Sequence, residues 1–262
     1  MRDQLHRPIA LDRTPKRIVS LVPSQTELLV DLGLEEAIVG ITKFCVHPKH
    51  LLKSKISVGG TKQVHYDKIW ELQPDIILCN KEENTKPMIA ELEKIAPVHI
   101  SDVNTFEDAL ELIHRYGALF EKEETAEQLA HDIMVKRNEF EAFVKDRPKK
   151  SVAYFIWKNP WMVAAKTTFI NEMLKENGFY NYFGNQERYP EIALTTEQPE
   201  SAELVFLSSE PFPFKDAHKA EVQAYFPNAA VHIVDGEMFS WYGSRLEKAF
   251  DYFKTLHQFP NP

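Results

Sequence analysis

Cysteine is scarce in this sequence, with only two residues, Cys45 and Cys79, among 262. That number excludes a disulfide framework and fits a reducing compartment, while the role of the two thiols stays open. Long hydrophobic runs are missing as well. The apolar stretches at 75–79 and 204–207 have the length of β-strands, whereas a bilayer needs roughly 20 apolar residues. We therefore expect no membrane-spanning segment.

Positive charge is also in short supply. The chain has 31 Lys and Arg against 39 Asp and Glu, a net charge of -8, and no strongly basic run. This balance argues against nucleic acid as a partner. With 44% apolar and 27% charged residues, the composition is that of a soluble globular protein with buried cores. A length of 262 residues allows one large domain or two of ordinary size.

The signatures of common enzyme classes are absent. The sequence contains no G-x-x-x-x-G-K-[ST] or G-x-G-x-x-G phosphate loop, no G-x-S-x-G, no H-E-x-x-H and no C-x-x-C. No intact catalytic pair is recognisable either. We therefore expect a binding protein and no catalytic residues.

Several potential metal ligands lie at or near predicted loops. They are Cys45, His47, His65, Glu82 and Glu83. Their spacing matches no closed zinc site, and buried thiols with solvated histidines explain them more simply. We expect no metal site; a first-row metal held directly by these side chains is the minor alternative.

Strands and helices alternate along the first part of the chain, which predicts an α/β protein. A strand is expected at 17–21 and a second at 37–41. Between them, Ser24 to Glu27 form an S-x-x-E capping box, in which Ser24 accepts from the Glu27 amide, and the helix that follows should end at Gly33. Further helices are expected at 66–72, 86–95, 106–120, 169–177 and 246–256, and further strands at 75–79, 98–100, 151–157, 203–207 and 231–234.

One long amphipathic helix is expected at 122–146, a stretch without Gly or Pro. It divides the chain into an N-terminal α/β lobe at 1–121 and a C-terminal α/β lobe at 147–262. The segments 73–80 and 201–208 each open a buried strand with an acidic residue and end in a polar loop. Duplicated lobes and the ordinary likeness of two buried strands explain this equally well.

Aromatic and basic side chains flank the predicted strand ends. The aromatic ones suit a large planar ligand and the basic ones its anionic groups, although core packing and surface solvation are the alternatives for each. The aromatic residues are Phe44, Trp157, Trp161, Tyr189, Phe239, Trp241 and Tyr242, and the basic residues are Lys43, Lys62, Lys81, Lys158, Arg188 and Arg245.

Four stretches carry a resemblance to a known family. They are 15–28 (PKRIVSLVPSQTEL), 32–33 together with 39–41 and Pro48, 69–78 (IWELQPDIIL) and 240–242 (SWY). They resemble the helical-backbone substrate-binding proteins of ABC importers, in the branch that binds cobalamin and ferric siderophores. The similarity runs from about Lys16 to Phe253 and is more specific in the first hundred residues than after Lys150.

The resemblance implies two Rossmann-like α/β lobes joined by one long backbone helix, with a ligand cleft between the lobes. Carried over position by position, the implied ligand-binding residues are Ser24, Gln25, Lys43, Phe44, Gly60, Thr61, Lys62, Asn80, Lys81, Glu82 and Glu83 in the first lobe and Trp157, Tyr189, Phe239, Trp241 and Tyr242 in the second. Trp241 and Tyr242, expected just after a strand and the polar turn 235–237, are predicted to supply the main apolar wall. A core position for Trp241 is the alternative.

The resemblance also implies a membrane permease as a possible partner, on which one surface glutamate of each lobe docks. Glu197 matches the second of these glutamates. Lys86 occupies the first-lobe position, which departs from the family pattern, so docking is assigned there to Glu83, with Glu82 nearby.

The implied function is to bind a corrinoid or an iron–siderophore for import, as a monomer without a resident cofactor, since the ligand itself brings cobalt or iron. Haem is a third candidate ligand. Met1 is followed by the polar residues 2–6 and no apolar leader, so the chain as written is expected in the cytoplasm, and in the periplasm if a leader was removed. The alternatives are a cytosolic corrinoid, haem or metal-chelate binder for storage, sensing or hand-off, and an enzyme acting on such a ligand.

Overall fold

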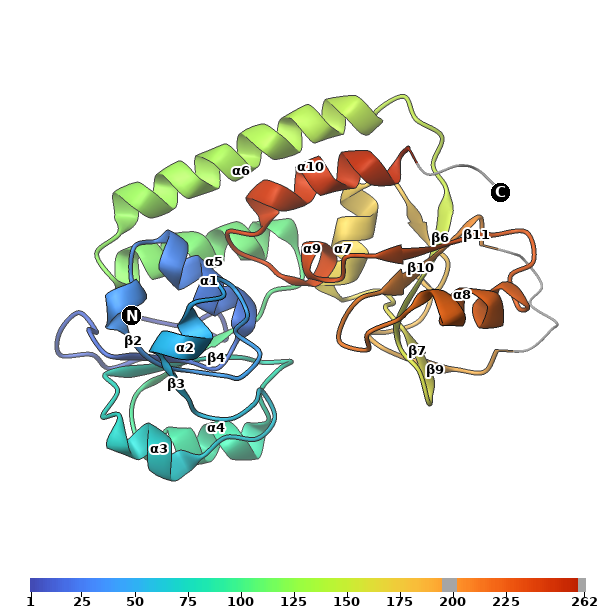
Figure 1. Ribbon diagram of the computed structural model, residues 1–262. Helices are drawn as coiled ribbons and strands as arrows, with labels where there is room; N and C mark the ends of the chain where they lie inside the picture. The colour runs from blue at the N-terminus through green and yellow to red at the C-terminus, as the bar shows by residue number, and fades with distance from the viewer. Residues whose placement is uncertain (195–201, 259–262) are drawn as a thin grey trace. The chain divides into compact units, whose positions relative to one another are not determined.

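The computed structural model describes residues 1–194 and 202–258 (Figure 1). The chain divides into two compact units. The first comprises Met1–Val103, Glu107–Ile133 and Tyr242–Arg245, and the second Asn104–Phe106, Met134–Trp241 and Leu246–Pro262. The boundaries expected from the sequence do not anticipate Tyr242–Arg245, a short segment near the end of the sequence that belongs to the first unit.

A parallel sheet forms the centre of the first unit. Its strands are β1 (Ile18–Ser20), β2 (Ile38–Ile41), β3 (Ile56–Ser57), β4 (Ile76–Asn80) and β5 (Val98–Ser101). They lie in the order β3-β2-β1-β4-β5, and all their pairings are parallel. The chain moves outward from β1 to β3 and then crosses back to β4. This topology puts a switch point between β1 and β4.

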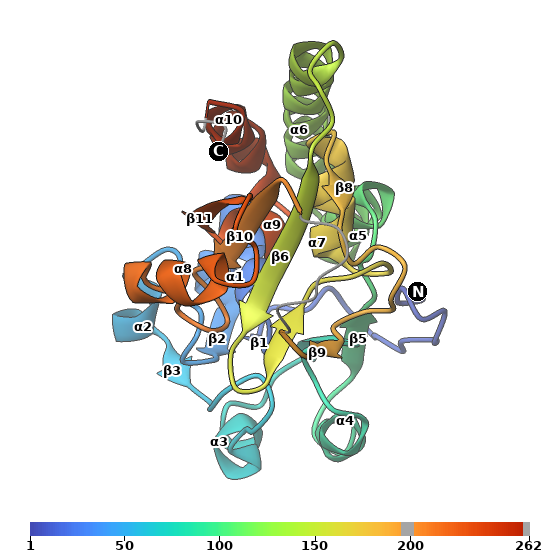
Figure 2. The same cartoon turned by 90° about the vertical axis from the view of Figure 1, so that its right-hand side faces the viewer.

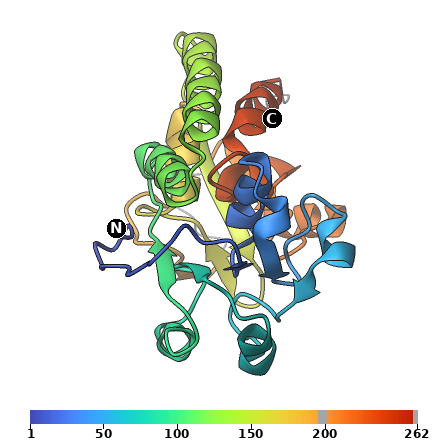
Figure 3. The ribbon, with the colours of Figure 1, turned by 90° about the vertical axis from the view of Figure 1, so that its left-hand side faces the viewer.

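Helices cover both faces of this sheet. They are α1 (Pro23–Asp31), α2 (Leu51–Ser54), α3 (Tyr66–Glu71), α4 (Lys86–Leu92) and α5 (Phe106–Leu119), with a 3-10 turn at Glu35–Ala37. α3 and α4 lie on one face and α1 and α5 on the other (Figure 3). Val19, Ile77 and Ile100 belong to the apolar core on the α3 and α4 face, because alternate residues of a strand point to the same side of a sheet.

The start of α1 differs from the prediction. The helix begins at Pro23, its N-cap is Val22, and no side chain caps the first turn. Proline already has the φ angle of a first helical residue, so the helix starts before Ser24, and the predicted capping box of Ser24 and Glu27 is wrong. The end of the helix is confirmed at Gly33, whose φ of 75° suits glycine.

A mixed sheet forms the centre of the second unit (Figure 2). Its strands are β6 (Ser151–Trp157), β7 (Trp161–Val163), β8 (Tyr180–Asn181), β9 (Glu191–Ile192), β10 (Leu204–Ser208) and β11 (Ala230–Val234). The order is β11-β10-β6-β7-β9, with β8 also paired to β6. β6 runs parallel to β10 and β8, and β10 parallel to β11, whereas β7 is antiparallel to β6 and β9.

The helices of the second unit pack on both faces of its sheet. They are α7 (Phe169–Glu176), α8 (Asp216–Gln223), α9 (Glu237–Ser240) and α10 (Leu246–Leu256). Val222 of α8 belongs to the same core as Phe155. The neighbouring strand residue Tyr154 points to the opposite face and contacts Phe239 of α9, which in turn contacts Phe253 of α10.

The predicted long helix is confirmed as α6, Glu123–Val144. It begins in the first unit and ends in the second. Its second part is anchored by Phe140, which is 1% exposed and contacts Phe250 and Phe253 of α10. No helix in the described residues has both the length and the apolar character that a membrane span requires.

The predicted α/β class and the order of the major elements are confirmed. The elements that the sequence analysis did not predict are short. They are the 3-10 turn at Glu35–Ala37 and α2, β3, β7, β8, β9, α8 and α9. Short segments carry too few residues to show a helical or alternating period, so tertiary pairing decides whether they form.

Candidate ligand-binding site

Polar side chains collect at the carboxyl ends of the strands in the first unit. α1 follows β1 closely and places Gln25 at this edge, while β4 and β5 end at Asn80 and Ser101. Parallel strands have their carboxyl ends at the same edge, and open α/β sheets bind ligands there, outside the switch point. The structure therefore brings the first-lobe residues implied by the resemblance together on one edge of the sheet.

Gln25 is the centre of a buried hydrogen-bond network. Its Nε2 donates to Ser101 Oγ at 2.6 Å and to Tyr242 Oη at 3.2 Å, and its Oε1 accepts from Tyr116 Oη at 2.6 Å. Asn80 Nδ2 donates to the same Ser101 Oγ at 3.0 Å. Burial raises the pKa of both tyrosines, so they remain neutral phenols. We call these five residues the buried polar network. It lies beneath the carboxyl edge of the first sheet and joins α1 to the ends of β4 and β5.

Lys43 and Phe44 form the exposed part of the edge after β2. Phe44 is 49% exposed, and Lys43 Nζ lies 5.1 Å from the centroid of its ring. The Lys43 amide donates to the Gly59 carbonyl at 2.8 Å, which ties this loop to the loop after β3. A Cβ on Gly60 would lie only 3.2 Å from the Phe44 ring, so glycine lets the loop pack closely there. An aromatic ring exposed at a ligand edge offers apolar contact area.

The loop after β4 is held in place by side-chain amides. Asn80 Oδ1 accepts from the amides of Glu82 at 2.8 Å and Glu83 at 3.2 Å. Asn84 Oδ1 accepts from the Asn80 amide at 2.8 Å, and Asn84 Nδ2 donates to the Thr61 carbonyl at 2.8 Å. The loops after β3 and β4 are therefore fixed to one another, and the edge is preorganised.

The lysines of this edge have different partners. Lys62 Nζ donates to the carbonyl oxygen of Glu82, and Lys81 forms an ion pair with Asp102. Lys43, over Phe44, and Lys62 thus provide cationic hydrogen-bond donors on the edge, whereas Lys81 is engaged by a carboxylate. Ser24 is 4% exposed and lies in the first turn of α1.

An aromatic cluster lies near the carboxyl ends of β6 and β10 in the second unit. Trp157 is 38% exposed and contacts Phe212 edge to face, with 5.6 Å between ring centroids. Phe212 also contacts Phe214 at 4.8 Å, and Trp161 stacks on Phe214 at 6.0 Å. Trp157 is therefore an exposed aromatic at a strand end, as predicted, and Trp161 braces the cluster.

Tyr189 lies on the segment that leads into β9. It is half-buried, and the Arg188 guanidinium lies 5.9 Å from its ring centroid. Its ligand-binding role stays a prediction.

Phe239 belongs to the core of the second unit. The residue is fully buried and lies 5.0 Å from Tyr154 and 4.9 Å from Phe253 between ring centroids. Its packing gives it a core role in the second unit, and its contact with a ligand stays a prediction. The predicted polar turn at 235–237 leads directly into α9, and one helical turn carries Phe239 into the interior.

Trp241 is also buried, at 6% exposed. Its Nε1 donates to Glu210 Oε1 at 2.9 Å, and the same oxygen accepts from Ser240 Oγ at 2.6 Å. Burial raises the pKa of the Glu210 carboxyl. Trp241 thus has a structural role in the second unit, and its contact with a ligand stays a prediction.

The two thiols are fully buried. Cys45 Sγ lies 3.1 Å from Thr26 Oγ1 and 3.3 Å from Thr42 Oγ1. Burial raises the pKa of Cys45 and Cys79, which makes both poor nucleophiles and poor metal ligands. Within residues 1–194 and 202–258, no three His, Cys, Asp or Glu side chains are grouped to hold a metal ion.

The structure describes only one of the two residues assigned to permease docking. Glu83 is half-buried on the loop after β4, and its amide is bound by Asn80. Glu197 lies outside the described residues. Docking through either glutamate stays a prediction.

Several residues of the site were missed by the sequence analysis. The sequence positions of Ser101 and Asn84 could have indicated a site role, because each is a polar residue at or just after the end of a buried strand. Phe212 follows the polar exit of β10 in the same way. Nothing in the sequence indicated a site role for Tyr116, because an aromatic residue on the apolar face of a helix is expected in the core.

Known proteins match most of the chain. The family described as periplasmic binding protein matches residues 18–224. An ABC transporter substrate-binding lipoprotein of Bacillus subtilis is 28% identical over 180 residues, which are 66% of this chain and 57% of that relative. The chain therefore matches less than two thirds of that relative's length. A vitamin B12-binding protein of Vibrio campbellii is 23% identical over 190 residues, 71% of this chain and 69% of the relative.

Solved structures share the fold. The periplasmic vitamin B12-binding protein of Vibrio cholerae has a TM-score of 0.77 at 19% identity, covering 94% of this chain and 99% of that one. A periplasmic haem-binding protein of Pseudomonas aeruginosa has a TM-score of 0.79 at 21% identity, with 95% of each chain covered. These likenesses confirm the two-lobed α/β fold.

Proposed function

Because this chain belongs to the periplasmic binding protein family, we propose that it is the substrate-binding component of an ABC importer and that its ligand is a corrinoid. The family consists of binding proteins, so the chain is not an enzyme. An iron–siderophore is the second ligand class. The names of the Vibrio relatives support the corrinoid assignment.

The carboxyl edge of the first sheet carries this proposal. Phe44 is exposed there on the loop after β2, which the Lys43 amide ties to Gly59, and Asn84 ties the next two loops together through Thr61. A macrocycle with amide side chains needs an apolar contact for its ring and both donors and acceptors for its rim. Lys43 and Lys62 supply donors, and the half-buried Glu82 and Glu83 carry carboxylates on the loop after β4 that can act as acceptors.

The proposal requires no resident cofactor, because a corrinoid or an iron–siderophore brings its own metal. The protein's part is to bind the periphery of the chelate and keep water from one of its faces. Trp157 with Phe212 offers a second exposed aromatic surface of the same chemistry in the other unit.

We also propose a permease partner and a site of action outside the cytoplasmic membrane, which membership of this family supports. The Bacillus subtilis relative is named a lipoprotein, and the Vibrio cholerae structure is named periplasmic. Such a protein presents its ligand to the permease as a monomer, and Glu83 and Glu197 are the proposed docking residues.

Titration of the protein with cyanocobalamin, dicyanocobinamide, haemin and ferrichrome tests the ligand class. Visible absorption reports the chelate, and intrinsic fluorescence reports the four tryptophans. We expect saturable binding of one corrinoid per chain. Saturation by haemin or ferrichrome alone would replace the corrinoid by that ligand, and no saturable change with any of the four would reject the proposed function.

A further inference from the structure

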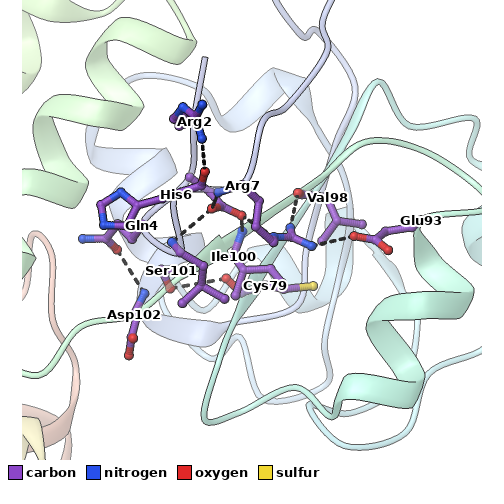
Figure 4. Close-up of polar contacts among 12 residues, drawn as sticks. Arg2, Gln4, His6, Arg7, Cys79, Glu93, Val98, Ile100, Ser101 and Asp102 are labelled. Atoms are coloured by element: carbon purple, nitrogen blue, oxygen red, sulfur yellow. Dashed lines mark hydrogen bonds and ion pairs between the residues drawn. The ribbon is translucent and has the colours of Figure 1, made fainter.

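The N-terminal arm, defined as residues 2–7, lies along the free edge of β5 (Figure 4). Asp3 is its anchor and is 0% exposed. The Asp3 carboxylate accepts from the amides of Leu5 at 3.0 Å and Arg7 at 2.9 Å, from Arg7 Nε at 2.8 Å and from the amide of Ile100 at 3.3 Å. The arm therefore folds around Asp3 and attaches itself to the strand through the same side chain.

The arm uses the backbone groups of β5 that face away from β4. The carbonyls of Pro97 and Ser101 accept from β4 and the residue after it, so the even-numbered residues of β5 direct their backbone groups outward. Arg7 Nη2 donates to the carbonyl of Val98 at 2.9 Å, and Asp3 accepts from the amide of Ile100. Side chains of the arm thus occupy the positions that a neighbouring strand would take.

Gln4 binds the next outward-facing backbone amide, at the carboxyl end of β5. Its Oε1 accepts from the Asp102 amide at 3.2 Å, and its Nε2 donates to the Asp108 carbonyl in α5 at 2.9 Å. Gln4 therefore ties the end of the strand to the first turn of α5, the helix that follows.

Ser101 stands between the two backbone amides that the arm holds, those of Ile100 and Asp102. Its Oγ accepts from Gln25 and Asn80 in the buried polar network and lies 3.5 Å from Tyr242 Oη. Because β5 is an edge strand, β4 restrains it from one side only, and the arm supplies the restraint on the other side.

We propose that Gln4, together with Asp3, is a positioning residue for ligand binding, acting through Ser101. The side chain of Gln4 holds the Asp102 amide, which fixes the backbone at Ser101 and keeps its hydroxyl where Gln25 and Asn80 can donate to it. The network in turn fixes the start of α1 and the loop after β4, which carry the ligand edge. This inference rests on the proposed function, because it assigns ligand binding to that edge.

The Gln4→Met variant tests the inference, because it removes both hydrogen bonds and nearly conserves side-chain length. We expect affinity for the bound corrinoid to fall about threefold to tenfold, the range that one or two net hydrogen bonds provide. In a Ser101→Ala background the same substitution should change affinity by less than about twofold, because the Ser101 hydroxyl through which Gln4 is proposed to act is already absent. Gln4→Ser, which adds no apolar surface, is the second variant.

Arg115→Met is the matched control. Arg115 Nη1 donates to the carbonyl of Arg2 at 2.6 Å and so holds the arm at a point away from Ser101. We expect this variant to bind with unchanged affinity. An equal effect of Gln4→Met in both backgrounds, no effect in either, or the same loss in Arg115→Met would overturn the inference while leaving wild-type binding intact. Absence of wild-type binding to any probe would instead reject the proposed function.

Discussion

Arg245 and Glu27 form a bidentate ion pair in the interior of the first unit. Arg245 Nε and Nη2 each lie 2.8 Å from a different oxygen of Glu27, and the two side chains are 6% and 7% exposed. Tyr242, at the other end of the same short segment, is bound by Gln25, also in α1. One helix therefore holds both ends of a segment that follows it by more than two hundred residues.

Replacing one partner of this pair should strongly destabilise the protein. Arg245→Met leaves the Glu27 carboxylate buried without its cation, and such losses cost about 3–5 kcal/mol. The measurement is the free energy of unfolding in urea. Arg13→Met removes an exposed pair with Asp75 and should cost less than about 1 kcal/mol. Equal losses in the two variants would contradict the structural importance of the buried pair.

Phe44 should contribute to ligand affinity and little to stability. The side chain is 49% exposed, so Phe44→Ala removes few core contacts, while truncation of an aromatic anchor costs about 2 kcal/mol, roughly thirtyfold in affinity. Titration with the corrinoid and a thermal melt measure the two effects. Trp70→Ala, on α3 and 63% exposed, is the control that should leave affinity unchanged. Unaltered affinity of Phe44→Ala would remove this residue from the site.

Trp241 should contribute to stability through its indole N–H. Trp241→Phe keeps most of the ring volume but removes the indole N–H. The Glu210 carboxylate then keeps the hydrogen bond from Ser240 and loses the one from Trp241. A hydrogen bond to a buried charged group contributes about 1.5–3 kcal/mol, so the melting temperature should fall by roughly 3–10 °C. Parallel ligand titration separates this role from the predicted apolar wall. A normal melting temperature combined with lost affinity would place Trp241 at the ligand instead of in the core.

Stability should fall between pH 6.5 and pH 4 because of His99. The imidazole is 0% exposed, and neither ring nitrogen has a hydrogen-bond partner among the residues that the structure describes. The ring lies edge to face on Tyr116, with 5.3 Å between centroids. Asp3 and Arg7 from the arm and Arg115 from α5 are the charged groups around it. Burial lowers the pKa of His99 from 6.5 to about 4.

The unfolded chain therefore binds a proton at His99 between these pH values while the folded chain does not. The stabilisation is complete above pH 6.5 and decreases as the pH falls toward 4, by up to on the order of 3 kcal/mol. Urea unfolding at a series of pH values measures it. His99→Phe should flatten this part of the profile, whereas His114→Gln, at an exposed position of α5, should not. A profile unchanged by His99→Phe would contradict the assignment.

The sequence predicted those elements whose pattern is local and long enough to recognise. The apolar strands, the helix end at Gly33 and the helix now seen as Glu123–Val144 follow from periodicity and from residues that end helices. The clustering of the polar residues at the proposed ligand edge was predictable for a related reason. Parallel strands bring their carboxyl ends together, so polar residues that follow separate strands, such as Lys43 and Asn80, are neighbours once the topology is known.

Tertiary structure alone decided the interior partners of that edge. The ion pair of Glu27 with Arg245 and the hydrogen bond of Gln25 with Tyr242 join residues that no local pattern relates. The burial of Phe239 depends on the single turn of α9, where one residue decides which side chain points inward. The sequence by itself determined the fold class and the edge at which a ligand is expected; the choice between an aromatic side chain in the core and one at the surface required the packing, because its apolar character is the same in both places.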